Sequence, residues 1–145
     1  MADSLLKILE YEKALLENML EVIEEQKEAL VKYDVDYLEI TNKKQNNLSQ
    51  KIFSAEKERI DFIQNWLKIS KSNASKIKLS EIEEQLPDDN RSEYLKLRKY
   101  LKTLINKINE ANSMNRVLAN RAGRTIREIL SVISGENNHV CNVKI

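Results

Sequence analysis

The sequence contains few residues that form turns, with two glycines and one proline in 145 residues. Sheets and barrels need such residues at short intervals, because each strand must reverse direction after a few residues. Aromatic residues make up only 6% of the chain, whereas charged residues make up 32%. This balance favours long amphipathic helices, and the hydrophobic share of 41% is too high for a fully disordered chain.

Other absences indicate in which compartment the protein resides and whether it enters a membrane. The single cysteine, Cys141, excludes a disulfide within the chain and fits a reducing compartment. The first residues, MADSLLKILEYEKALLE, have no basic segment ahead of an apolar one, so we expect no signal peptide. No apolar run approaches the ~20 residues of a membrane span. We therefore expect a cytoplasmic protein that does not insert into a membrane.

The chain also lacks the patterns that mark catalytic and metal sites. His139 and Cys141 are its only histidine and cysteine, whereas a structural zinc site takes about four ligands. Gly123 and Gly135 are the only glycines, so a glycine-rich phosphate loop is excluded. Neither a nucleophile elbow nor an HExxH motif occurs. We therefore expect a protein that is not an enzyme and that holds neither a cofactor nor a metal.

Hydrophobic periodicity predicts two long helices in the first half of the chain. The first begins near Asp3 or Ser4 and ends before an interruption at residues 32–38. The second follows a cap at Asp34 or Asp36 and ends near Leu67 or Ile69. Its alternating 3–4 spacing is that of a coiled-coil seam with the polar members Thr41, Gln45 and Arg59.

The second half predicts a short helix and then the longest one. Residues 70–76 read as a polar loop, and residues 78–89 read as a short helix that Pro87 ends. Ser80 and Glu83 have the spacing of a capping box in that helix. The longest helix covers residues 91–134, with an N-cap at Asp88, Asp89 or Asn90. We expect a bend or a close contact at Gly123 and the end of the helix at Gly135.

Together these elements predict an all-α fold. We expect a long antiparallel helical hairpin, or coiled-coil bundle, of three main helices with a short extra helix. Residues 1–135 would form one helical bundle domain, and residues 136–145, which have no helical period, would form a flexible C-terminal tail.

An amide ladder interrupts the apolar pattern of the longest helix. Asparagine recurs at every third residue, at positions 106, 109, 112 and 115. Residues at this spacing are neighbours on a helix but drift around it, so the four form a slanted ridge. One buried asparagine would fix the register of a coiled coil. The ladder could instead belong to a wet groove for an incoming helix, because a primary amide both donates and accepts hydrogen bonds.

The groove interpretation defines a candidate binding surface on this helix. Apolar residues would receive the anchors of the bound segment, and the amides would satisfy its polar groups. The expected binding residues are Leu101, Leu104, Ile105, Ile108, Asn109, Asn112, Met114, Asn115 and Leu118.

Charge is distributed unevenly along the chain. Residues 1–33 hold eight acidic and four basic residues, whereas residues 91–135 hold three acidic and ten basic ones. The acidic first helix and the basic last helix can attract each other. The arginines at positions 116, 121, 124 and 127 could instead contact phosphates, but no aromatic residue lies among them. We therefore expect no nucleic-acid partner.

Two blocks of the sequence, residues 34–59 with the Lys44-Gln45 pair and residues 104–130 with Asn112 and Asn115, resemble the FlgN family of flagellar type III export chaperones. The first block, residues 34–59, is similar to the family's first hairpin, with an Asp, Leu38, the Lys44-Gln45 pair, Leu48 and a closing Arg59. The second block, residues 104–130, is similar to the family's long last helix. Its matching residues are Asn112, Asn115 and Leu118. The family often has a tyrosine in its tail, which SGENNHVCNVKI lacks.

The resemblance implies a function that composition alone does not give. The protein would be a cytoplasmic chaperone that binds the helical C-terminal segment of hook-associated proteins, which form the hook-filament junction. It would prevent their premature assembly and deliver them to the gate and ATPase components of the type III export apparatus. A coiled-coil structural or adaptor protein that self-associates is the alternative, and a homodimer stays open in either case.

Overall fold

A computed structural model describes residues 2–134 of the chain, and these residues form helices with no strand among them. The predicted all-α fold is therefore confirmed. The elements in chain order are α1 Ala2–Val31, α2 Val35–Leu67, α3 Lys71–Lys76, α4 Leu79–Ile82, the short 3₁₀ helix η1 Glu83–Gln85 and α5 Asp88–Ser134. The predicted stop at Gly135 and the tail with His139 and Cys141 lie outside the described residues.

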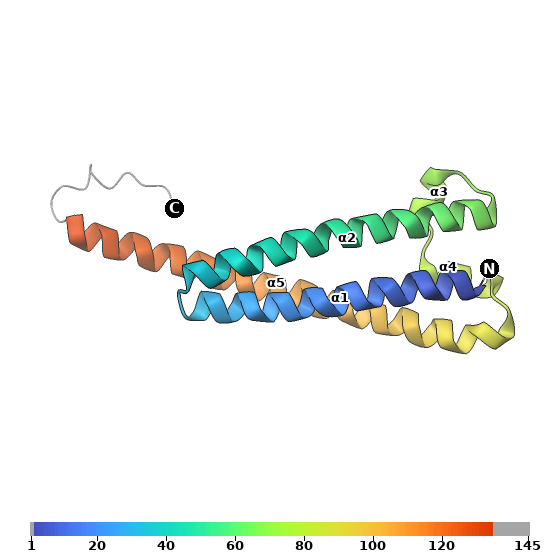
Figure 1. The fold of residues 1–145 in the computed structure, drawn as a ribbon, viewed down its shortest axis with the longest axis horizontal. Coiled ribbons are helices and arrows are strands. Elements are labelled where there is room, and N and C mark those ends of the chain that lie inside the picture. Colours follow the sequence, from blue (N-terminus) through green and yellow to red (C-terminus); the bar gives the residue numbers. More distant parts are fainter. Residues whose placement is uncertain (1, 135–145) are drawn as a thin grey trace.

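The first two helices form an antiparallel hairpin (Figure 1). Asp34 is the N-cap of α2, as predicted, because its Oδ1 accepts a hydrogen bond of 3.0 Å from the backbone nitrogen of Tyr37. At the other end of α2, Lys68 takes the left-handed conformation with a φ of 54°. Its backbone N–H then donates to the carbonyl of Gln64 and ends the helix.

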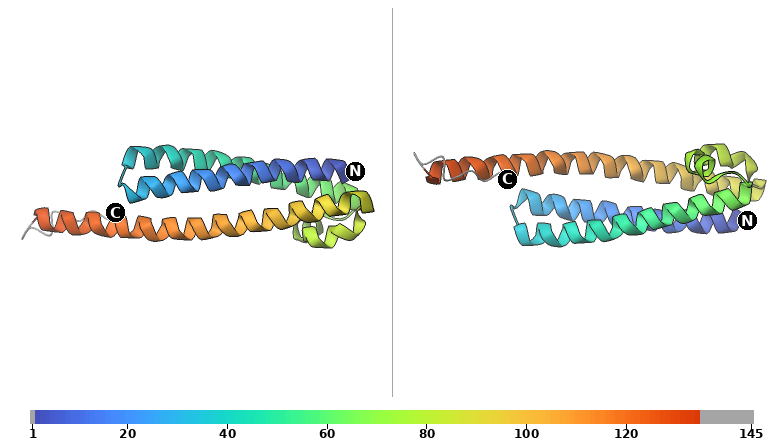
Figure 2. Two further views of the ribbon diagram at one scale, coloured as in Figure 1. Left: turned by 90° about the horizontal axis from the view of Figure 1, so that it is seen from below. Right: turned by 90° about the horizontal axis from the view of Figure 1, so that it is seen from above.

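Helix α5 lies along the hairpin and projects beyond its tip (Figures 1 and 2). With 47 residues it is about 70 Å long. It begins at Asp88, so Asp88 and Asp89 lie in its first turn and are not the caps that we predicted. Their negative charges interact favourably with the positive end of the helix dipole. Gly123 makes no close contact, since a Cβ added there would meet no atom within 4 Å.

The connection between α2 and α5 differs from the prediction. Residues 71–76 form the helix α3, because Ser70 caps it by accepting from the nitrogen of Asn73 and because Ala74 is buried in the core. The capping box expected at Ser80 and Glu83 is not used. The N-cap of α4 is Lys78, two residues before Ser80, and the side chain of Glu81 accepts a hydrogen bond of 3.1 Å from the backbone nitrogen of Lys78.

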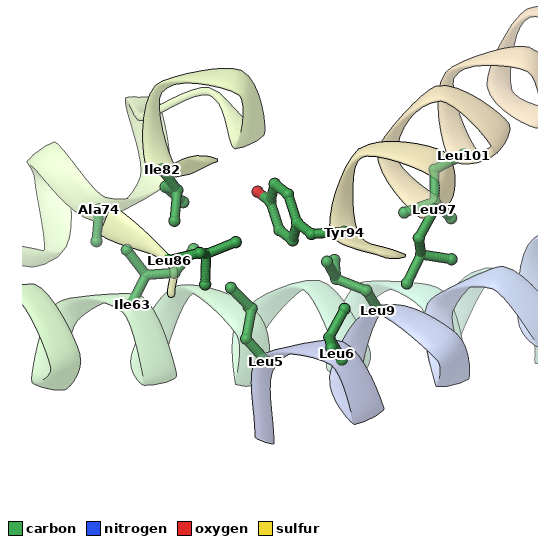
Figure 3. Close-up of a cluster of buried hydrophobic side chains, with 10 residues drawn as sticks. All are labelled: Leu5, Leu6, Leu9, Ile63, Ala74, Ile82, Leu86, Tyr94, Leu97 and Leu101. Atoms are coloured by element: carbon green, nitrogen blue, oxygen red, sulfur yellow. The ribbon is translucent and has the colours of Figure 1, made fainter. Parts of the chain in front are cut away.

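The main core lies at the end of the bundle where the connection packs. Residues of α1, α2, α5 and the connection meet there, and Tyr94 and Ile82 are fully buried (Figure 3). The Tyr94 hydroxyl donates to the carbonyl of Leu79, and the Arg98 guanidinium pairs with Glu83 at 3.5 Å. The connection thus occupies the space between α2 and α5 at this end. The buried members are Leu5, Leu6, Leu9, Ile63, Ala74, Ile82, Leu86, Tyr94, Leu97 and Leu101.

A second core is smaller and lies farther along the bundle, where Met19 and Ile23 of α1 pack against Ile108 of α5. Between the two cores the Arg59 Nε donates a hydrogen bond of 2.8 Å to the Glu12 Oε1. Only 18% of the Arg59 side chain and 12% of the Glu12 side chain are exposed. Burial raises the pKa of Glu12, and the charge of Arg59 and its hydrogen bond oppose that rise.

Candidate functional site

Helix α1 packs against both α2 and α5, whereas α2 and α5 face each other across a groove. At the end with the main core, the connection fills the space between them. Farther along, no other segment of residues 2–134 lies between these two helices. The floor of the groove is therefore α1, and its walls are α2 and α5. The groove has three sections, which differ in chemistry.

The section nearest the connection is mainly apolar, with some polar side chains among the residues that line it. Leu16 and Met19 form its floor, and Ile52 and Ile108 line its two walls. At the rim, 69% of Phe53 and 47% of Ile105 are exposed. Large apolar side chains on facing walls of a hollow can receive the apolar face of another helix. The remaining residues that line this section are Gln45, Ser49, Glu56, Asn109 and Asn112.

The central section is lined by side-chain amides from all three helices. The Gln26 Nε2 donates to the Asn42 Oδ1 at 2.7 Å and to the Gln45 Oε1 at 3.0 Å, which joins α1 to α2. The Asn115 Nδ2 donates to the Gln26 Oε1 and to the carbonyl oxygen of Ile23, both at 2.9 Å, which joins α5 to α1. We call Gln26, Asn42, Gln45, Asn112 and Asn115 the amide cluster.

The third section lies between the tip of the α1–α2 hairpin and the projecting part of α5. It is a hollow of about 410 Å³ that apolar side chains line almost entirely. Several of these are substantially exposed, including Tyr33 and Val35 on the hairpin and Ile129 on α5. The other lining residues are Ala29, Leu30, Asp34, Leu38, Ala122, Thr125 and Ile126.

The three sections form one continuous groove. Gln45 and Asn112 line both the first and the central section, and Leu30 and Leu38 line both the central section and the tip. Along α5 the groove reaches from Ile105 to Ile129, which is about 36 Å at 1.5 Å per residue. A helix of roughly 24 residues matches that length.

The predicted binding residues divide between the groove and the core. Ile108, Asn109, Asn112 and Asn115 line the groove together with Ile105. Ile108 and Asn115 are at the same time buried against α1, because they occupy the bottom of the groove.

Four other predicted residues lie elsewhere. Leu101 and Leu104 are buried inside the bundle, with 3% of each exposed. Half of Met114 is exposed and Leu118 is half-buried, but neither lines a described section of the groove. Whether these residues bind another protein stays a prediction.

The wall and the floor that the hairpin contributes to the groove were not predicted from the sequence. Gln26 and Phe53 line the groove, but the periodicity of α1 and α2 predicted only which residues face a neighbouring helix. Phe53 gave one usable signal. It is a large aromatic residue off the predicted seam, and an exposed aromatic side chain indicates an interaction surface when it adjoins other apolar residues.

The described residues offer little to other kinds of site. None of the helices within residues 2–134 is long and apolar enough to cross a membrane. Over the same range, no three His, Cys, Asp or Glu side chains are grouped so that they could hold a metal ion.

Comparison with known protein families gives a match over nearly the whole chain. The family model described as FlgN protein matches residues 1–143, which is nearly the whole chain. The resemblance seen in the blocks at residues 34–59 and 104–130 is thereby confirmed. No curated protein and no solved structure matches the chain.

Proposed function

The chain belongs to the FlgN family of flagellar export chaperones, and from that premise we propose that it binds the C-terminal helical segment of hook-associated proteins. The bound segment lies in the groove between α2 and α5. While it is held there in the cytoplasm, the client cannot use this segment to assemble. The chaperone then delivers the client to the type III export apparatus.

The observation that carries this proposal is that the connection between α2 and α5 fills the end of the groove at the main core. At the closed end, α4 and η1 lie between α2 and α5, and Ile82 belongs to one buried cluster with Ile63 of α2 and Tyr94 of α5 (Figure 3). A short helical segment with an apolar side chain therefore fits this space. The open part of the groove offers the same kind of walls without a segment between them, so a client helix can continue the pattern.

The exposed rim residues provide a driving force for capture. Burial of a large apolar side chain contributes roughly 1.5–3 kcal/mol. Phe53, Ile105 and Val35 are 69%, 47% and 71% exposed in the free protein, so a client helix can cover substantial apolar area. The client must become ordered as it binds, which costs free energy and keeps the affinity moderate. A moderate affinity suits a chaperone that must release its client for export.

Titration calorimetry with C-terminal segments of hook-associated proteins tests the proposal. We expect binding to the full chain and at least about tenfold weaker binding to the variants Phe53→Glu and Ile105→Glu, because each places a charge in the apolar section. Val117→Glu is the matched control, because Val117 is 44% exposed on the same helix and lines no described section of the groove. Absence of binding by every segment, or equal losses in all three variants, would contradict the proposal.

Self-association through the same groove is the second candidate function. Two exposed apolar residues favour it, because Val35 at the tip is 71% exposed and Val132 on the projecting part of α5 is 80% exposed. Light scattering on the purified chain separates the two candidates. A stable oligomer that does not dissociate when client segments are added would favour a structural coiled-coil protein.

A further inference from the structure

The amide cluster divides the apolar groove at its middle. Four of its five hydrogen bonds attach α2 or α5 to α1. The fifth crosses the groove, since the Gln45 Nε2 of α2 donates to the Asn112 Oδ1 of α5. At 3.3 Å it is the longest of the five, and a long hydrogen bond is a weak one. A helix that enters the groove meets this bond.

The cluster also has hydrogen-bonding capacity that the described chain does not use. An amide nitrogen can donate two hydrogen bonds. Within residues 2–134 the Nδ2 of Asn112 and the Nδ2 of Asn42 donate none, and water can reach both because Asn112 is half-buried and Asn42 is exposed. A bound helix would displace that water. It must then supply acceptors for these groups or leave them unsatisfied at a cost in affinity.

We propose that the amide cluster selects client helices and fixes their register in the groove, an inference that depends on the proposed function. The selected helix carries a hydrogen-bonding residue, preferably Asn or Gln, at its middle. This residue replaces the bond between Gln45 and Asn112 by pairing with both amides. A helix with an apolar residue at its middle breaks the bond between Gln45 and Asn112 and offers these amides no hydrogen bond in its place.

The spacing of the three sections fixes where the anchors of the client helix must lie. Along α5, Ile108 in the first section is about two turns from Asn115, and Ile126 at the tip is about three turns beyond Asn115. The selected helix therefore has apolar residues about two turns to one side of its central amide and about three turns to the other. A shift by one turn would move the central amide away from the amide cluster, and a shift by two turns would bring an apolar anchor onto it.

Two designed peptides test the selection on the full chain. Each is a helix of about 28 residues with leucines two and three turns from its centre on both sides, so that it fits in either direction. One has Gln at the centre and the other has Leu, and fluorescence anisotropy gives each Kd. We expect the Gln peptide to bind about tenfold more tightly, because the Leu peptide leaves the amides unpaired. Simple hydrophobic capture gives the opposite order, because Leu adds apolar area.

The reciprocal change in the protein completes the test. We expect the double variant Gln45→Leu with Asn112→Leu to prefer the Leu peptide, because apolar side chains then replace the two amides whose bond crosses the groove. Asn106→Leu is the matched control, because Asn106 belongs to the same amide ladder but is exposed and lines no described section. It should keep the preference for the Gln peptide. Circular dichroism of each variant checks that the helices are retained.

The outcomes separate this inference from the proposed function. Equal binding of the two peptides, tighter binding of the Leu peptide or no binding of the Gln peptide to the unmodified chain overturns the selection. The proposed function then still stands if C-terminal segments of hook-associated proteins bind, and it fails only if these do not.

Discussion

Replacement of Arg59 by methionine should destabilise the protein strongly at neutral pH and much less in acid. The substitution keeps an apolar stem of similar length but removes the cation that lies 2.8 Å from the Glu12 carboxylate. Glu12 is then left as a nearly buried charge with no partner, since only 12% of its side chain is exposed. Glu56, which approaches Arg59 at 4.0 Å, adds a second negative charge nearby.

The magnitude follows from the geometry and the burial of the pair. At 2.8 Å and an effective dielectric constant of about 20, the gross attraction is about 6 kcal/mol, and much of it offsets the cost of desolvation. Loss of one partner of a buried pair costs about 3–5 kcal/mol. Both side chains keep some exposure, so we expect the lower limit, about 3 kcal/mol. For a chain of this size that lowers the Tm by roughly 6–12 °C.

The pH dependence has a definite sign. Burial already raises the pKa of Glu12 above 4.5, and without Arg59 the pKa rises further. The folded Arg59→Met variant therefore favours the protonated carboxyl. Its penalty is absent well below pH 4.5, grows as the pH rises toward the folded pKa and is constant above that value. Urea unfolding of the variant and the unmodified chain at pH 4 and pH 8 measures the difference.

Two variants make this reasoning refutable. Glu12→Gln in the Arg59→Met background removes the unpaired charge and should recover at least about half of the lost stability at pH 8. Lys43→Met is the control, because Lys43 pairs with Glu39 at the surface and the change should stay within about 0.5 kcal/mol. A loss in Arg59→Met that is equal at both pH values, or that Glu12→Gln does not reduce, would refute the account.

Three further changes test packing and helix geometry by thermal unfolding. Tyr94→Phe should lower stability by about 1–2 kcal/mol, because it leaves the Leu79 carbonyl without its partner, whereas Tyr100→Phe at the surface should change little. Lys68→Gly should raise stability by about 1 kcal/mol, because Lys68 has a positive φ that glycine adopts without strain. Gly123→Ala should also raise it by about 1 kcal/mol, and a loss would reveal a contact at this open position.

The long helices could be predicted because their signals are local. The cap at Asp34 and the end at Leu67 depend on residues within one turn of each position. The helix at residues 71–76 was missed for a different reason. Its polar composition reads as a loop, and the burial of Ala74 depends on Ile63 and Ile82, which the fold brings to it from other elements. Propensity gives way to tertiary packing at such short segments.

The groove could be predicted only in part, because a sequence does not reveal which sides of a helix its neighbours cover. Ile105 and Leu104 are adjacent and both apolar, yet Leu104 is buried inside the bundle and Ile105 stays at the rim of the groove. The amide ladder divides in the same way. Asn115 is buried at the bottom of the groove and bonded to α1, as a register-fixing residue would be, whereas Asn109 and Asn112 are less buried and line the groove. The register interpretation therefore fits Asn115, and binding by Asn109 and Asn112 stays a prediction.

Helix α1 packs against both α2 and α5, but the ribosome makes these two partners at different times. Helices α1 and α2 adjoin in sequence and can pair while the ribosome is still translating residues beyond Leu67. The bond from Asn115 to Ile23, in contrast, joins residues 92 positions apart. A nascent chain thus has one wall of the groove and its floor long before the other wall exists. Under the proposed function, a nascent chain would therefore hold a client only after α5 has been synthesised.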